Sequence, residues 1–351
     1  MATETVLQEH GDTARRKLGF LGVGVVLLLV TSVIAIAIGS VRVPLTEVVA
    51  VLFGGGTGTQ QAIVWNVRLP RVLAAIAVGA GLAIAGAAMQ SVLRNPLGAP
   101  YTLGISQAAA FGAAFSIVVF GIDGAGAGGL AVPATYLTAL AAFLGSLVST
   151  GVILLLVVYR RATPETMILT GVAIGSLFTA GVTTLQYFAS DTEVAAIVYW
   201  TFGDVGRATW SSAAVMATVL VLTTAYFLRH GWDYELLDAG TKTAKSLGVD
   251  VESLRIRGMA IASLATAVVV SFVGIIGFVG LVAPHIVRKL IGGDERYLIP
   301  ASALVGGTLL VAADTLARTV VAPVVLPVGV LTSFLGAPLF VYLVIAGREY
   351  W

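Results

Sequence analysis

The sequence contains no cysteine, only three histidines and few charged side chains. Without cysteine, the chain has neither disulfide bonds nor thiolate metal ligands. Asp, Glu, Lys and Arg make up 11% of the 351 residues, against about 25% in an ordinary soluble domain. The net charge is +2 and there is no run of Lys and Arg, so nothing indicates nucleic-acid binding. A chain with so little polar surface needs a lipid bilayer to cover much of it.

Motifs for catalysis are also missing. No lysine follows the glycine-rich stretch Gly54–Thr59 as it would in a phosphate-binding loop, so no ATP site is expected on this chain. His10, His230 and His285 lie far apart and form no histidine-based zinc motif. The apolar stretches carry no central pair of carboxylates for a proton relay, and Asp314 is the only acidic residue well inside one. We therefore expect no enzyme activity, no metal and no cofactor on this chain, and an energy source on a separate subunit.

Hydrophobic residues make up 58% of the sequence and fall into long stretches. An apolar stretch of roughly 18 or more residues predicts a transmembrane helix, and the 41 glycines suit membrane helices whose backbones approach closely. The pattern predicts an all-α, polytopic membrane protein with about ten transmembrane helices. The apolar stretches are 18–38, 71–92, 103–121, 134–158, 166–188, 210–228, 258–290, 298–317 and 322–347.

The orientation of the chain follows from its basic residues. Arg15, Arg16 and Lys17 precede the first apolar stretch, which is too long for a signal peptide and lacks a convincing cleavage site. Because basic residues favour the cytoplasmic side, residues 1–17 are predicted to be a cytoplasmic tail and residues 18–348 a transmembrane domain. Both termini are then expected in the cytoplasm, with the protein multi-pass in the cell membrane.

The apolar stretch 258–290 has two interpretations. As a single span it places Arg288 and Lys289 outside the cell. As a hairpin of two short spans, hinged at a glycine within 274–280, it returns them to the cytoplasm and places Arg318 outside. Both interpretations give ten spans with both ends inside, and the single-span interpretation must then split 322–347 in two. The preference of basic residues for the cytoplasm favours the hairpin.

Three arginines are candidates for docking an external partner. Arg68 and Arg71 are predicted at the outer end of the second span, and the hairpin topology brings Arg318 to the same face. A guanidinium binds a carboxylate through two parallel hydrogen bonds, so these residues suit acidic side chains on a partner protein. Interfacial snorkelling is the alternative for Arg68 and Arg71, and an i,i+4 pair with Asp314 is the alternative for Arg318.

A turn rich in proline and glycine, Arg94–Pro100, separates two apolar stretches at the inner side. Irregular backbone at membrane depth is tolerated where it is buried in protein or lines a cavity. The turn is therefore either an ordinary connection or a gate on a substrate path, with Asn95 and Leu97 at the constriction. A second inner turn contains Thr163 and matters only if it faces the same path.

The longest polar segment, residues 229–257, has helical spacing and mixed charge, and is predicted to be cytoplasmic. Within it, Ala244–Val249 follows a helical stretch and turns at Gly248. The segment is either a solvated loop or a small helical pair that docks into a groove on a cytoplasmic partner.

Several motifs resemble one family, the iron-chelate and vitamin B12 permeases, which are the transmembrane subunits of type II ABC importers. They occur in the family's order and cover nearly the whole chain. They are Arg68–Arg71 (RLPR), Gly86 with Met89 and Gln90, Asn95–Leu97 (NPL), Leu103–Ser106 (LGIS), Ala244–Val249, Gly277–His285 (GFVGLVAPH), Ala313–Asp314, Pro327–Val330 and Gly336–Phe340.

The resemblance implies a homodimer with a central path, two ATPase subunits that bind ATP and Mg on the cytoplasmic side, and an external substrate-binding protein. It also implies three groups of site residues. These are Arg68, Arg71 and Arg318 for docking of the binding protein, Asn95, Leu97 and Thr163 for the cytoplasmic gate, and Ala244, Leu247, Gly248 and Val249 for contact with the ATPase.

The family's cargoes are cobalamin, ferric siderophores and haem. We expect cobalamin first, with a ferric siderophore or haem next, although no single residue decides among them. A path for bulky chelates needs weak contacts because transport requires release as well as entry, and spans rich in glycine and alanine suit this. The alternatives are a stand-alone secondary transporter or channel and a membrane scaffold without transport.

Overall fold

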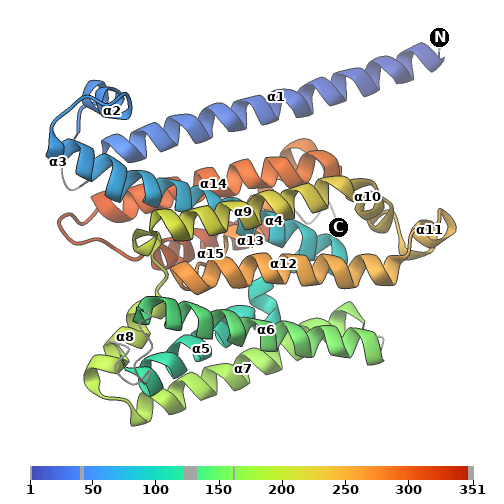
Figure 1. The fold of residues 1–351 in the computed structure, drawn as a ribbon. Helices are drawn as coiled ribbons and strands as arrows, with labels where there is room; N and C mark the ends of the chain where they lie inside the picture. Colours follow the sequence, from blue (N-terminus) through green and yellow to red (C-terminus); the bar gives the residue numbers. More distant parts are fainter. Residues whose placement is uncertain (1, 40–42, 122–132, 161–162, 347–351) are drawn as a thin grey trace.

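The computed structural model describes residues 2–39, 43–121, 133–160 and 163–346, which form a bundle of helices (Figure 1). No strand occurs in these ranges, so the predicted all-α class is confirmed. The predicted domain end at residue 348 lies outside them. The helices are α1 (Ala2–Ala37), α2 (Leu45–Leu52), α3 (Gly58–Gln61), the π-helix η1 (Ala62–Arg68), α4 (Leu69–Leu93), the 3₁₀-helix η2 (Pro100–Leu103), α5 (Ile105–Phe120), α6 (Ala134–Arg160), α7 (Pro164–Phe188), α8 (Asp191–Thr201), the 3₁₀-helix η4 (Val205–Arg207), α9 (Trp210–Arg229), α10 (Gly231–Asp238), α11 (Thr241–Ser246), α12 (Val251–Val273), α13 (Val279–Ile291), α14 (Glu295–Thr319) and α15 (Val328–Ala346).

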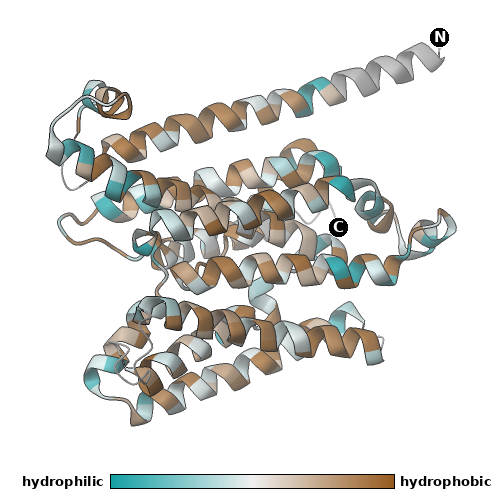
Figure 2. Cartoon of the chain, in the orientation of Figure 1, coloured by the Kyte–Doolittle hydropathy of each residue, from teal (hydrophilic) through white to brown (hydrophobic). Residues whose placement is uncertain are grey.

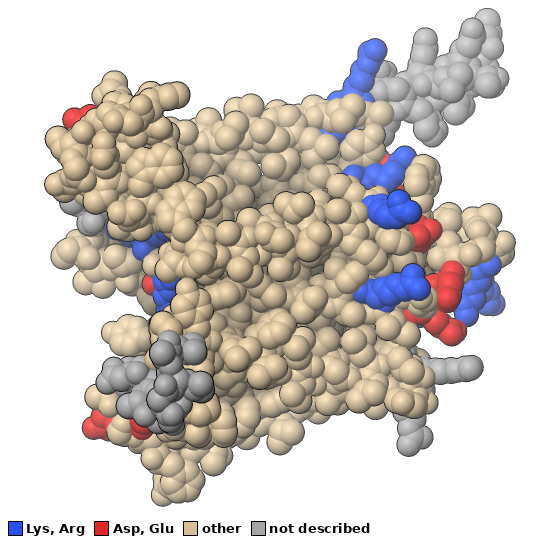
Figure 3. Space-filling view, in the orientation of Figure 1, with Lys and Arg blue, Asp and Glu red and all other residues tan. Residues whose placement is uncertain are grey.

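The bundle has the surface of a membrane protein. Seven helices of the described chain are long and apolar enough to cross a membrane, and α5 and α15 contain shorter apolar helices. Figure 2 shows apolar residues along most of their length. Figure 3 shows charged side chains gathered toward the two ends of the bundle, with an uncharged band between them. Such a distribution places the helices across a bilayer, with the charges in the polar layers on either side. We call the two ends the α2 end and the α11 end, after the short helices that mark them in Figure 1.

The stretch 258–290 is a hairpin. Helix α12 ends at Gly274, whose φ of +79° suits glycine, and α13 starts after a short non-helical segment. At the far end of α13, Arg288 Nη1 lies 3.7 Å from Asp238 Oδ2 of α10, so α13 returns to the α11 end. The 13 residues of α13 span about 20 Å, less than a bilayer's apolar thickness. The hairpin interpretation of this stretch is therefore confirmed, except that α12 with 23 residues is long enough to cross a membrane and only α13 is short.

Helix α4 is the central element, and every residue from Ala77 to Leu93 is buried. Glycines let two neighbours approach its backbone closely. A Cβ on Gly79 would lie 2.8 Å from the carbonyl carbon of Gly306 in α14, and a Cβ on Gly86 would lie 2.5 Å from that of Gly280 in α13. Small residues therefore pack α13 and α14 directly against α4, as expected for helices associating in lipid.

Several helix boundaries differ from the sequence-based prediction, and two helix starts differ most. Helix α1 begins at Ala2, so the predicted tail 1–17 is largely helical. The second span was predicted to start at residue 71, but α3, η1 and α4 form one continuous helical segment from Gly58 to Leu93. A capping box between Thr57 and Gln60 fixes its start. The polar residues at its beginning hid this extension from a search for apolar stretches.

Candidate functional site

Five charged residues meet at the α2 end, and we call them the arginine cluster: Arg68, Arg71, Asp204, Asp314 and Arg318. Asp314 is 1% exposed and lies at the centre. Arg71 donates to both of its oxygens at 2.8 to 3.0 Å, and Arg318 Nε donates to Oδ2 at 3.1 Å. Arg71 Nη2 also lies 3.4 Å from Asp204 Oδ1. One buried carboxylate thus holds two guanidinium groups, a geometry that their planar donors favour.

The same cluster closes the end of α1. Arg68 Nη1 donates to the carbonyls of Ile36 and Ala37, and Arg318 donates to those of Ala35 and Ile38 at 3.1 Å. The last carbonyls of a helix have no partner within it and carry partial negative charge, so cations there are stabilising.

The structure brings the three predicted docking arginines together, with Arg68 and Arg318 buried and the Arg71 side chain 14% exposed. The i,i+4 pair of Asp314 and Arg318 is present. Arg68 and Arg318 are less than a tenth exposed, so they do not reach out to water as snorkelling side chains do. A carboxylate from another protein would have to reach cations that already hold internal partners. Their docking role stays a prediction.

The turn after α4 has the break that the sequence predicted. Arg94 adopts a left-handed conformation with φ +46° and ends α4. Asn95 Oδ1 accepts a hydrogen bond from Leu97 N at 2.8 Å, which fixes the turn. The Leu97 side chain is half-exposed, and it lines a cavity together with residues of η2.

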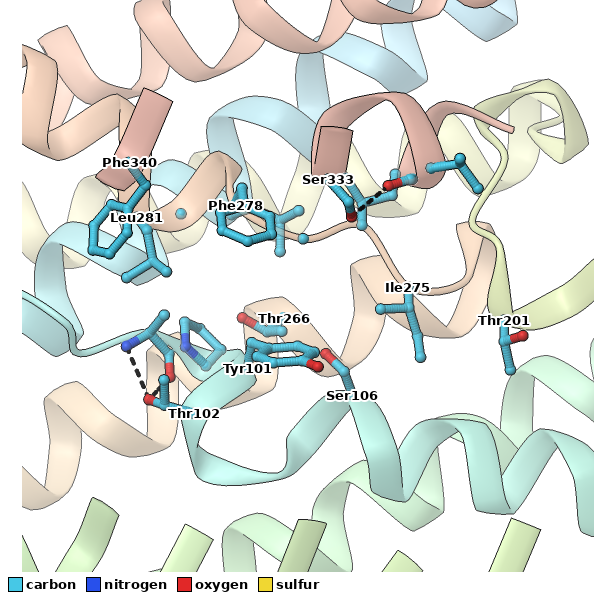
Figure 4. Close-up of a pocket in the computed structure, with 18 of the residues that line it drawn as sticks. Tyr101, Thr102, Ser106, Thr201, Thr266, Ile275, Phe278, Leu281, Ser333 and Phe340 are labelled. Carbon is cyan, nitrogen blue, oxygen red and sulfur yellow. Dashed lines mark hydrogen bonds between the residues drawn. The ribbon is translucent and has the colours of Figure 1, made fainter. Parts of the chain in front are cut away.

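This cavity has a volume of about 770 Å³, lies between two groups of helices and is open to the surface of the chain, where Phe334 and Tyr101 are exposed. One wall comes from η2 and the start of α5, and the other from the break between α12 and α13 and from α15. Figure 4 shows Phe278 and Phe340 on one side and Tyr101 on the other. Among the described residues, none that lines it is charged. Its shape and apolar lining are typical of a path or site for a bulky, weakly held ligand.

Of the three predicted gate residues, Leu97 alone is among the described residues that line the cavity, although Asn95 is hydrogen-bonded to it. Thr163 accepts a hydrogen bond from Thr166 N at 3.4 Å and caps α7. Thr163 and Asn95 are not among the described residues that line the cavity, whereas Leu97 is. The gate stays a prediction, and Leu97 is its best-placed member.

The predicted coupling segment contains a pair of short helices, α10 and α11. Gly248 follows α11 with φ +88°, and Val249 N donates back to the carbonyl of Ala244 at 3.0 Å. Ala244 is buried, whereas the side chain of Leu247 is 62% exposed at the tip. Figure 1 shows α11 projecting from its end of the bundle. The helical pair is confirmed, and its contact with an ATPase stays a prediction.

Sequence reasoning missed a buried ionic cluster at the α11 end. It joins four helices through Ser91, Asp238, Arg288 and Glu295. Ser91 Oγ donates to Glu295 Oε1 at 2.5 Å, and Arg288 Nη2 donates to the same oxygen at 3.1 Å. An acidic residue just before an apolar stretch is typical of an exposed helix start. Glu295 has this position in the sequence, yet its side chain is only 1% exposed. The separation of these residues in the sequence hid their association.

Comparisons with known proteins agree with this architecture. The FecCD transport family matches residues 27–346. An ABC transporter permease protein of Methanocaldococcus jannaschii is 52% identical over 339 residues, which cover 96% of this chain and 97% of that protein. The hemin transport system permease HmuU of Yersinia pestis is 39% identical, covering 84% of this chain and 87% of that protein. The cobalamin import system permease BtuC of Halobacterium salinarum is 39% identical, covering 81% and 74%.

A solved structure gives the same result. It shows an inward-facing conformation of a metal-chelate type ABC transporter, with a TM-score of 0.81 and 30% identity, and covers 93% of this chain and 98% of that chain. The family resemblance drawn from the sequence motifs is thereby confirmed. The chain belongs to the FecCD transport family.

Proposed function

We propose that this chain is the permease subunit of an ATP-driven importer that moves a metal chelate across the cell membrane into the cytoplasm. The observation that carries the proposal is the open cavity of about 770 Å³ in a membrane-spanning bundle, none of whose described lining residues is charged. Such a cavity admits a bulky cargo without binding it tightly, and tight binding would prevent release. Membership of a transport family supports the same function. The chain itself acts as a permease and not as an enzyme.

Among chelates we propose cobalamin first, with haem or a ferric siderophore next. Five aromatic rings line the cavity, and large planar side chains offer contact area to a flat macrocycle. They belong to Tyr101, Phe202, Phe278, Phe334 and Phe340. The absence of charge among its described lining residues gives a highly anionic chelate no counter-charge there.

We propose that two copies of the chain surround the path and that an external binding protein delivers the cargo at the α2 end. Docking there would bring acidic side chains to Arg68, Arg71 and Arg318. Because Asp314 already holds Arg71 and Arg318, a docking carboxylate competes with it for the same donors. This competition keeps the contact weak enough for the binding protein to leave.

At the α11 end, we propose that two ATPase subunits bind the permease dimer and carry ATP and Mg. The exposed Leu247 and the turn at Gly248 supply a projecting apolar tip that fits a groove, with Ala244 and Val249 holding its shape. This end, with both termini, then faces the cytoplasm. Asn95, Leu97 and Thr163 would contribute to the gate on the same side.

Reconstitution into liposomes tests the proposal. The permease is purified with its ATPase, and the binding protein is added outside with labelled cobalamin, haem or a ferric siderophore. We expect uptake of one chelate class that requires ATP, the ATPase and the binding protein. Uptake driven by an ion gradient without the ATPase would instead identify a stand-alone secondary transporter, and no uptake of any chelate would reject the proposed cargo.

A further inference from the structure

The ionic cluster at the α11 end connects the short helix α10 to the half-length helix α13. Asp238 is the last residue of α10, and its Oδ2 lies 3.7 Å from Arg288 Nη1 near the end of α13. Ser91 of α4 lies 3.5 Å from the same oxygen. Arg288 is also held by Glu295 of α14, whose side chain is almost fully buried. Asp238 is therefore the member of the cluster that belongs to the proposed ATPase-binding segment.

Helix α13 is a short rod of 13 residues between two glycine joints, and Pro284 inside it cannot donate to the carbonyl of Gly280. Before it stand Gly274 and Gly277, and after it stand Gly292 and Gly293. Gly274 and Gly292 have positive φ values of +79° and +85°. Glycine adopts such conformations readily, so the chain can change direction at both ends of the rod. Hinge positions of this kind absorb the backbone rotation when a helix moves as a unit.

The other end of α13 lies at the cavity. Phe278, which caps the helix, and Gly280 and Leu281 in its first turn all line it (Figure 4). The ring of His285, farther along α13, lies 6.4 Å from that of Phe340 in α15, which is another lining residue. A displacement of α13 therefore moves the wall of the cavity that Phe278, Leu281 and Phe340 share.

We propose that the contact between Asp238 and Arg288 transmits motion from the ATPase-binding segment α10–α11 to α13, and so to the cavity wall. This inference rests on the proposed function, because it presumes an ATPase at α11. Asp238 and Arg288 are positioning residues that touch no cargo. When α10 shifts, Asp238 draws Arg288 and the α13 rod with it, and Leu281 and Phe278 move at the opposite end.

The electrostatics of the contact suit a link that can be loosened. The Asp238 side chain is 29% exposed, and its separation from Arg288 is longer than that of Glu295, which lies 3.1 Å from Arg288. Burial raises the pKa of Asp238 above its ordinary value, although Arg288, Glu295 and Ser91 act in the opposite direction. The charged carboxylate thus gains little stability from its site. Asp238→Asn should leave the fold as stable as before, which separates a role in transmission from a role in folding.

The test uses the permease, its ATPase and the binding protein together in liposomes. Cargo uptake and ATP hydrolysis are then measured on one sample, which gives the amount of cargo moved per ATP. For Asp238→Asn we expect normal ATPase co-purification and ATP hydrolysis. Arg288→Gln also removes the cation of the buried Glu295 and should be less stable, so the comparison rests on Asp238→Asn. We expect cargo moved per ATP to fall by about fivefold or more, the lower end of a typical coupling between sites. Arg288→Lys, which keeps the charge, should restore part of the loss.

A second readout follows the cavity wall directly. The chain has no cysteine, so Leu281→Cys gives a single reporter. In the otherwise unchanged complex, nucleotide should alter the rate at which a thiol reagent labels this position, and Asp238→Asn should abolish that difference. Lys17→Gln is the matched control: it removes a 3.0 Å pair with Asp294 at the same end that does not involve α10, and both readouts should stay normal.

The outcomes separate the two proposals. Suppose that the complex with native Asp238 and Arg288 transports cargo. If Asp238→Asn then moves the same amount of cargo per ATP and shows the same nucleotide response at Leu281→Cys, the transmission role is wrong. The importer function stands in that case. A loss of thermal stability in Asp238→Asn that matches its loss of uptake would make the contact merely structural. If the native complex shows no ATP-dependent uptake, both proposals fail.

Discussion

The contact between α4 and α13 should not tolerate a single added methyl group at Gly86. A Cβ there would lie 2.5 Å from the carbonyl carbon and 2.8 Å from the Cα of Gly280. Non-bonded carbon atoms prefer separations of about 3.5 to 4.0 Å, so the two backbones must move apart by about 1 Å. Overpacking of a tight interior costs about 1 to 3 kcal/mol, and we expect Gly86→Ala near the upper end because backbone, not a side chain, must move.

Gly81→Ala is the matched control in the same helix. Its Cβ would meet Val269 Cγ2 at 3.6 Å, an ordinary contact. Alanine is a better helix former than glycine by about 0.5 to 1 kcal/mol, so this variant should be neutral or slightly more stable. Both glycines are buried in α4, which keeps the comparison close.

The assay is unfolding by SDS titration, followed by circular dichroism, with chelate uptake measured in parallel. Gly86→Ala should unfold at a clearly lower SDS fraction than Gly81→Ala. It should also transport less, because Gly280 and Leu281 line the cavity. Equal midpoints for the two variants would refute the close packing of α4 and α13.

Three further predictions concern the ends of the bundle. Asp314→Ala leaves Arg71 and Arg318 without their shared carboxylate and should cost about 3 to 5 kcal/mol in the same unfolding assay; an unchanged midpoint would contradict the arginine cluster. Proline at position 248 cannot adopt φ +88° and has no N–H to donate to the carbonyl of Lys245. Gly248→Pro should therefore lose ATPase co-purification while the helix content of the chain stays unchanged. Gly248→Asn, which tolerates a positive φ, should retain ATPase co-purification. Burial acts to raise the pKa of Asp294, but hydrogen bonds from Arg296 and Lys17 outweigh it and hold the pKa below its ordinary value. The stability that Asp294 provides is thus present above about pH 4 and lost as the pH falls through the lowered pKa; Asp294→Asn should remove this acid-dependent loss, and an identical pH profile would count against it.

The sequence predicted features that depend on local pattern and charge. Apolar stretches located the long helices, and the rule that basic residues favour the cytoplasm led to the hairpin at 258–290. The hairpin in turn placed Arg318 with Arg68 and Arg71, and the structure confirms that they lie together. The turn signal at Gly248 located the helical pair correctly.

The features that escaped prediction depend on contacts between distant parts of the chain. Arg71 and Asp314 are separated by 243 residues, and nothing local reveals that one carboxylate holds two arginines. Glu295 resembles an exposed helix start, yet Ser91 and Arg288 bury it. The cavity likewise needs the turn at Leu97 and the break at Phe278 to face each other, which only tertiary packing decides.

The proposed importer function requires that α11 faces the cytoplasmic side of the membrane. Leu247→Cys would be the only thiol in the chain, and its side chain projects from the tip of the segment. In intact cells and in inverted vesicles, a membrane-impermeant maleimide should label it only in the vesicles, and added ATPase should protect it. Labelling from outside intact cells would contradict the account, because no ATP-hydrolysing partner could then hold this end of the bundle.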